Sequence, residues 1–67
     1  MNEVEVIYIN EKGQYKERKF KRYKGMDNAL TVYRQTINKL RDEGTFALIV
    51  LRKFQHGYWV LEKSERV

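Results

Sequence analysis

Cysteine and proline are both missing from this chain of 67 residues, and glycine occurs only four times. Without cysteine, neither a disulfide framework nor a thiolate zinc site can stabilise the fold. A domain this short buries only about 60% of the surface that its unfolded chain exposes. Self-association is a common way of adding stability to such a domain.

Long apolar runs are missing too. No stretch without a charged residue is longer than Gly44–Leu51, which is far shorter than the ~20 residues that a membrane helix needs. The N-terminal segment carries Asn2, Glu3 and Glu5 instead of the basic start and apolar run of a signal peptide. We therefore expect a soluble, cytoplasmic protein with one domain, residues 1–67, and no membrane segment. The charged tail, residues 62–67, is expected to fray.

Groups that carry catalysis are scarce. The single histidine, His56, lies in a predicted turn, and the single serine, Ser64, lies in the charged tail, so no nucleophile has a positioned base. Carboxylates do not cluster with metal-ligand spacing, and the glycines lie 12 to 19 residues apart, which excludes a glycine-rich phosphate loop. Acid–base chemistry between Glu5 and Glu17 is conceivable, but pairing with lysine explains both residues more simply. We expect a non-catalytic protein without metal or cofactor.

The two ends of the chain favour β-hairpins. Residues 4–10 and 14–23 have strand character, and Asn10–Gly13 predicts a type I turn with glycine in the left-handed position. Residues 45–54 are apolar on both faces, which is typical of a central strand. A turn at residues 55–57 then leads into a last strand over residues 58–61.

Between the hairpins, the sequence predicts one helix over residues 28–43, with Asp27 as its N-cap and Gly44 just past its C-terminus. Its apolar residues follow one another at steps of four and three, the spacing of a helix that lies on a sheet. These residues are Met26, Leu30, Tyr33, Ile37 and Leu40.

These elements predict an α+β fold of the order ββαββ. We expect a four-stranded, mainly antiparallel sheet in which the apolar strands are central, giving the spatial order 2-1-3-4, with one helix packed on one face. A single helix covers only one face of four strands. The other face therefore retains exposed apolar side chains.

The positive charge is concentrated in one segment. Residues 16–24 carry six basic and one acidic side chain, whereas the other 58 residues carry eight of each sign. The whole net charge of +5 therefore belongs to the second strand and its exit. An acidic partner is the natural complement of such a segment.

The predicted turn sets a register in which Glu5 lies opposite Lys19, a favourable ion pair, and Ile9 lies opposite Tyr15. Lys19 and Lys21 then share the face of Glu5. The other face combines four cations with two rings: Lys16, Arg18, Arg22, Lys24, Tyr8 and Phe20.

Which face the helix covers is left open by the sequence, although burying an apolar face costs less than burying four cations. We therefore expect the helix to cover Ile7, Ile9 and Tyr15, with the cationic face open. In the alternative, the helix covers Val4, Val6 and Phe20, and two cations extend past it.

The first functional hypothesis is nucleic-acid binding, because cations along a strand contact phosphates and rings between them stack on bases. The phosphate contacts would come from Lys16, Arg18, Lys19, Lys21, Arg22 and Lys24, and the stacking from Tyr8, Phe20 and Tyr23. Six engaged cations predict a log–log salt slope near about −5 for duplex DNA. The simpler interpretation of the same lysines is protection of an edge strand against unwanted pairing.

The second hypothesis is a protein-interaction module, a small adaptor or inhibitor that binds through its uncovered sheet face or a sheet edge. The partner is an acidic protein surface or a second copy of the chain. Aromatic residues near the second turn, Phe54, Tyr58 and Trp59, are the candidate contacts, with Tyr58 favoured over Trp59, which fits the core. Lys53 opposite Trp59 is expected to make a cation–π contact.

Overall fold

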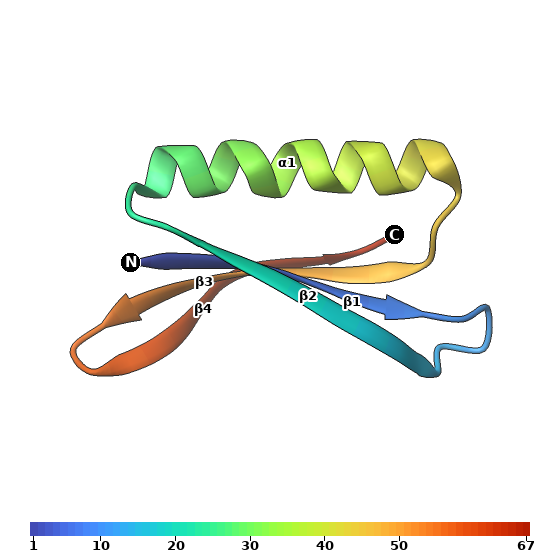
Figure 1. Ribbon diagram of the computed structural model, residues 1–67, viewed down its shortest axis with the longest axis horizontal. Helices are drawn as coiled ribbons and strands as arrows, with labels where there is room; N and C mark the ends of the chain where they lie inside the picture. Colours follow the sequence, from blue (N-terminus) through green and yellow to red (C-terminus); the bar gives the residue numbers. More distant parts are fainter.

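The computed structural model describes all 67 residues and confirms the ββαββ order. The elements are β1 (Asn2–Ile9), β2 (Tyr15–Tyr23), α1 (Met26–Glu43), β3 (Ala47–Gln55) and β4 (Tyr58–Arg66). All neighbouring strands pair antiparallel, and the sheet has the expected order β2-β1-β3-β4. The helix lies along one side of a strongly twisted sheet (Figure 1).

The β1–β2 turn forms as the sequence predicts. Gly13 adopts a positive φ of 81° and donates its backbone N–H to the carbonyl of Asn10. The Asn10 side chain also accepts hydrogen bonds from the backbone N–H groups of Lys12 and Gln14, each 2.9 Å long. Asparagine is favoured in turns because its side chain can replace a missing backbone partner in this way.

The helix begins earlier than predicted. Its N-cap is Gly25, which makes no side-chain capping bond, and Asp27 lies inside the first turn. The prediction of Asp27 as N-cap is therefore wrong. The carboxylate of Asp27 still interacts favourably with the positive end of the helix dipole. The helix ends as expected, at Gly44 in the left-handed conformation with φ of 71°.

The last strand is longer than the sequence indicated. Instead of fraying after Leu61, the charged segment continues β4 to Arg66, and Val67 donates its backbone N–H to the carbonyl of Ala47. A one-residue irregularity in the β3–β4 pairing falls at Glu62, because Leu51 pairs with Lys63 while Arg52 pairs with Leu61. The charged residues of this strand are held by backbone pairing rather than by burial.

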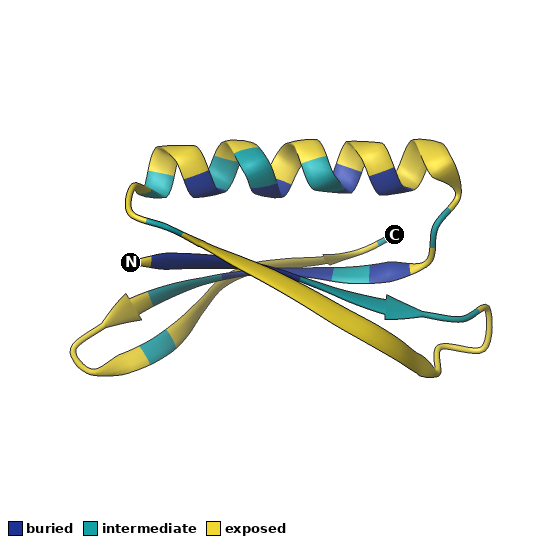
Figure 2. Cartoon of the chain, viewed as in Figure 1, coloured by how far each residue is buried: buried dark blue, intermediate teal, exposed yellow.

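The core lies between α1 and the two central strands. Helix residues Ala29, Tyr33, Ile37 and Leu40 are buried, as the dark bands on the underside of α1 show (Figure 2). They pack on a row of buried residues from the sheet: Val4, Ala47, Ile49 and Leu51. Fully burying a valine, leucine or isoleucine side chain contributes roughly 1.5–3 kcal/mol.

The expectation for the covered face is wrong. Val6 and Tyr8 pack against the core beside Val4, so α1 covers this face of β1 and not the face of Ile7, Ile9 and Tyr15. The physical reason is the opposite face of β1, which carries Glu3 and Glu5. Covering two carboxylates with an apolar helix would cost more than covering valine and tyrosine.

The expected β1–β2 register is also wrong beyond the first pair. Ile9 does pair with Tyr15, but the next pair joins Tyr8 to Glu17, so Lys16 is an extra, unpaired residue in a β-bulge. Because side chains alternate along a strand, one extra residue moves the rest of β2 to the opposite face. Glu5 consequently lies opposite Phe20 and not opposite Lys19.

Candidate binding face

The side of the sheet that α1 does not cover, here called the open face, can be followed from strand to strand because directly paired residues share a face. It combines charged, aromatic and aliphatic side chains from all four strands. They are Glu3, Glu5, Ile7 and Ile9 in β1, Tyr15, Arg18, Phe20 and Arg22 in β2, Leu48, Val50, Arg52 and Phe54 in β3, and Trp59, Leu61, Ser64 and Arg66 in β4.

At the centre of the open face, two carboxylates bind three arginines. Oε2 of Glu5 lies 2.5 Å from Nε of Arg18, and Oε1 of Glu5 lies 2.6 Å from Nη1 of Arg52. Glu3 is 3.2 Å from Nε of Arg22 and 3.4 Å from the same Nη1 of Arg52. Arg52 therefore joins both carboxylates into one network that spans β2, β1 and β3.

Both carboxylates are buried although no element covers this face. Glu3 is 7% exposed and Glu5 is 3% exposed, because the arginine side chains lie over them. A buried carboxylate is tolerated only with charged partners and satisfied hydrogen bonds, and no buried side-chain polar atom lacks a partner here. The outermost charged layer of the open face is consequently made of guanidinium groups.

Aromatic rings hold the arginines in place. The guanidinium carbon of Arg22 lies 5.0 Å from the ring centroid of Trp59 and 5.7 Å from that of Phe20. The guanidinium carbon of Arg18 lies 5.4 Å from the ring centroid of Phe20, and the rings of Trp59 and Phe54 meet edge-on with their centroids 5.3 Å apart. Arg22 of one edge strand thus reaches across the sheet to a ring of the other edge strand.

Apolar side chains surround this network at the surface. Phe20 is 52% exposed, Phe54 is 44% exposed and Leu61 is 60% exposed. Exposed aromatic rings beside arginines form the composition that protein interfaces favour. The open face can therefore offer both apolar area and guanidinium donors to a partner.

The nine residues predicted for nucleic-acid binding do not form one strip. Three of them, Arg18, Phe20 and Arg22, lie on the open face, and both arginines contact carboxylates. Lys16 is in the bulge and Lys24 follows β2. The other four share the face of α1: Lys19, Lys21, Tyr8 and Tyr23.

The lysines of the segment keep their charge unneutralised. No ion pair in the chain involves a lysine; all five involve arginine. Nζ of Lys19 lies 5.9 Å from the ring centroid of Tyr8, and Nζ of Lys21 lies 5.9 Å from the ring centroid of Tyr23. Together with Lys16 and Lys24, they form an exposed margin along the edge of the sheet, here called the lysine edge.

The three predicted interface residues separate as well. Phe54 and Trp59 lie together on the open face, whereas Tyr58, 70% exposed, points to the other side. The expected contact of Lys53 with Trp59 is wrong, because Lys53 pairs with Val60 and the cation over Trp59 is Arg22.

Sequence reasoning missed Glu3, Glu5 and Arg52 as parts of the site. A signal was present: carboxylates at positions 3 and 5 interrupt the apolar pattern of a strand that is central in the sheet. Such residues require cations on both neighbouring strands. Arg52 in β3 and the arginines of β2 meet that requirement.

Three further observations concern the chain as a whole. The chain holds no group of three or more histidine, cysteine, aspartate and glutamate residues that could bind a metal ion. Its helix lacks the combination of length and apolar character that a membrane crossing requires. Comparison with protein-family models, with curated proteins and with solved structures finds no match.

Proposed function

We propose that this chain is a non-catalytic, cytoplasmic protein-interaction module whose open face binds an acidic and partly apolar surface of another protein. The observation that carries the proposal is the layering of the open face. Its carboxylates are buried at the bottom, and its arginines and aromatic rings lie on top. An approaching partner therefore meets positive charge and apolar surface together.

The arginines are arranged to bind a second carboxylate. Arg18 and Arg22 contact Glu5 and Glu3 through Nε. A guanidinium has five N–H donors, so each arginine has further donors to offer. Both side chains are about half exposed, at 54% and 52%. Since stacking and ion pairing already fix the guanidinium planes, little side-chain entropy is lost when a partner binds.

The only tryptophan, Trp59, lies on the open face and reports on binding there. We expect its fluorescence to change in a saturable way on titration with a synthetic peptide rich in glutamate and leucine. A peptide in which lysine replaces glutamate is the control and should leave the fluorescence unchanged. Equal responses to both peptides would rule out recognition by the arginines.

A matched pair of variants locates the binding. Leu61 lies on the open face and Val60, its neighbour in β4, lies on the other side; both are exposed. Leu61→Glu should weaken binding of the acidic peptide at least about tenfold, because it puts a negative charge where apolar contact is expected. Val60→Glu carries the same charge change and should bind as the original chain does. Equal losses in both variants would contradict an open-face site.

The lysine edge favours a second candidate function, the binding of nucleic acid. Its four lysines have no carboxylate partner and are free to contact phosphates. If all four engage duplex DNA, the log–log salt slope should be about −3.6, at about −0.9 per phosphate. Fluorescence anisotropy of a labelled duplex at several salt concentrations gives this slope. A slope near zero would remove this candidate and leave the protein-interaction proposal in place.

A further inference from the structure

The two edges of the sheet differ in charge. The β2 edge carries cations with a single acidic residue, so a second copy paired along it would put cations opposite cations. The β4 edge instead carries both signs over the five residues Glu62-Lys63-Ser64-Glu65-Arg66. An edge strand of mixed charge lacks this repulsion and remains available for pairing.

The order of charges in this segment is complementary to itself. When two copies of β4 pair antiparallel about Ser64, Glu62 of each copy meets Arg66 of the other, and Lys63 of each meets Glu65 of the other. Every charge in the segment then lies opposite a charge of the other sign, which is the favourable arrangement for directly opposed residues in a sheet.

We propose that this chain forms a two-fold homodimer by antiparallel β4–β4 pairing centred on Ser64, which joins two sheets into one of eight strands. A two-fold axis perpendicular to the sheet, passing midway between the two Ser64 residues, keeps both helices on the same side. The two open faces then become one continuous surface. This proposal does not rest on the function proposed above.

Three of the four charges of the segment have no ion-pair partner within the chain. Glu65 pairs with Arg41 of α1 at 2.5 Å, but Glu62, Lys63 and Arg66 take part in no ion pair within the chain. A second copy would supply a partner of opposite sign for each of these three. The pairing therefore matches side chains that the single chain leaves unmatched.

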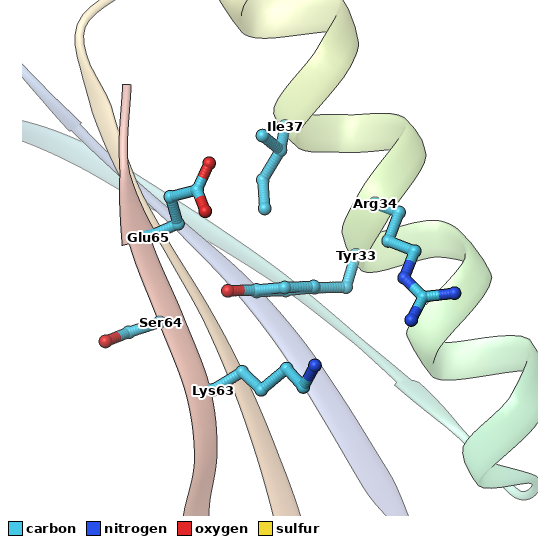
Figure 3. Close-up of a pocket in the computed structure, with 6 residues that line it drawn as sticks. All are labelled: Tyr33, Arg34, Ile37, Lys63, Ser64 and Glu65. Carbon is cyan, nitrogen blue, oxygen red and sulfur yellow. The ribbon is translucent and has the colours of Figure 1, made fainter.

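Four of the five residues have faces that agree with this register; the fifth, Glu62, lies at the irregularity in the β3–β4 pairing. Lys63 and Glu65 both point from β4 toward α1, with the ring of Tyr33 between them, and Ser64 points the other way (Figure 3). Arg66 shares the open face with Ser64. Lys63 and Glu65 can therefore meet their counterparts on the helix side of the joined sheet.

The helix packs over the central strands and not over β4. The buried residues of α1 pack on β1 and β3, and a pocket of about 470 Å³ separates the helix from β4. This pocket is lined by Tyr33, Arg34, Ile37, Lys63, Ser64 and Glu65 (Figure 3). In the proposed dimer, two such pockets adjoin between the helices, so the helices need not collide.

Analytical ultracentrifugation over a range of protein concentrations tests the proposal. The original chain should sediment as a monomer–dimer equilibrium. Arg66→Glu should raise the dissociation constant at least about tenfold, because two like-charge pairs with Glu62 replace two favourable ones. Glu62→Arg should do the same through opposed arginines. Circular dichroism confirms that each variant remains folded.

The double variant Glu62→Arg with Arg66→Glu restores opposite charges at both pairs. It therefore distinguishes a specific pairing of residue 62 with residue 66 from a general effect of changing the charge of β4. Its dissociation constant should return to within about threefold of the original. A chain that stays monomeric at every concentration would overturn the proposal. So would a double variant that dimerises no better than the single variants. Loss of the dimer in Leu61→Glu with no effect of either charge reversal would also overturn it, since that result assigns the contact to the open face.

Discussion

Glu3 and Glu5 occupy positions in a central strand that apolar residues normally fill. Each is stabilised by two arginines on the neighbouring strands, and one of these, Arg52, is shared by both carboxylates. The network therefore depends on Arg52 more than on any other cation. At this scale the structure explains why a face without a covering helix nevertheless contains buried charge.

Replacement of Arg52 tests the network. Arg52→Met leaves each carboxylate with a single arginine, and breaking a buried charge pair in this way costs about 3 kcal/mol. Since Arg52 is 30% exposed, we expect a loss toward the lower end of the range for buried pairs. Urea unfolding at neutral pH measures the change in free energy. Arg34→Met, on an exposed helix residue without an ion pair, is the control and should change it by less than about 0.5 kcal/mol. Equal midpoints for both variants would show that the network adds nothing to stability.

Tyr33 gives the chain a specific sensitivity to alkaline pH. Burial raises the pKa of its phenol above the ordinary value of about 10, and the nearby carboxylate of Glu65 raises it further. The fold thus favours the protonated phenol. Its contribution to stability is fully present below the unfolded pKa and is lost as pH rises toward the folded pKa.

Unfolding at several alkaline pH values measures this effect. Between about pH 9 and about pH 11, the free energy of unfolding should fall less steeply in Tyr33→Phe than in the original chain. Tyr58→Phe changes an exposed tyrosine and should keep the original slope. If Tyr33→Phe and Tyr58→Phe have the same slope, Tyr33 is not the responsible group.

At the scale of the elements, local patterns were sufficient for most of the fold. The apolar spacing in α1, the Asn10–Gly13 turn and the two-sided apolar run of β3 predicted the order and neighbours of the strands. The register of β2 was not predictable in the same way. Almost every residue of that strand is exposed, so no apolar alternation fixes which face is which. The bulge at Lys16 decided it, and with it the partners of Arg18 and Arg22.

A substitution in the β3–β4 turn should make the fold more stable. Gln55 pairs with Tyr58, so the loop has two residues, and both His56 and Gly57 have positive φ, at 54° and 86°. Positive φ at both positions is the requirement of a type I′ turn, for which Asn-Gly is the preferred sequence. His56→Asn should therefore stabilise the chain by about 0.5–1 kcal/mol, because asparagine tolerates this conformation better than histidine. Thermal unfolding checks the sign.

A loss of stability in His56→Asn would mean that the histidine makes a contact that the turn geometry does not require. Gly57→Ala is the opposite control at the adjacent position. It should lower the melting temperature, because alanine at positive φ is strained.

At the scale of the whole molecule, each surface has a different character. One face of the sheet packs under α1, the open face presents arginines and rings, the β2 edge carries lysines, and the β4 edge carries self-complementary charges. The excess positive charge thus divides between two surfaces, although it comes from a single segment of the sequence. Because of this division, the net charge of the segment does not by itself discriminate between a nucleic-acid partner and a protein partner.

In the proposed function, the partner binds to the open face. The most direct test is to follow the backbone amide NMR signals of the chain during titration with the glutamate–leucine peptide. The largest shifts should fall on open-face residues of three strands, at Phe20, Arg52 and Leu61, and the outer side of α1 should stay unchanged. Shifts confined to the lysine edge or to α1, with none at these three residues, would show that the peptide does not bind to the open face.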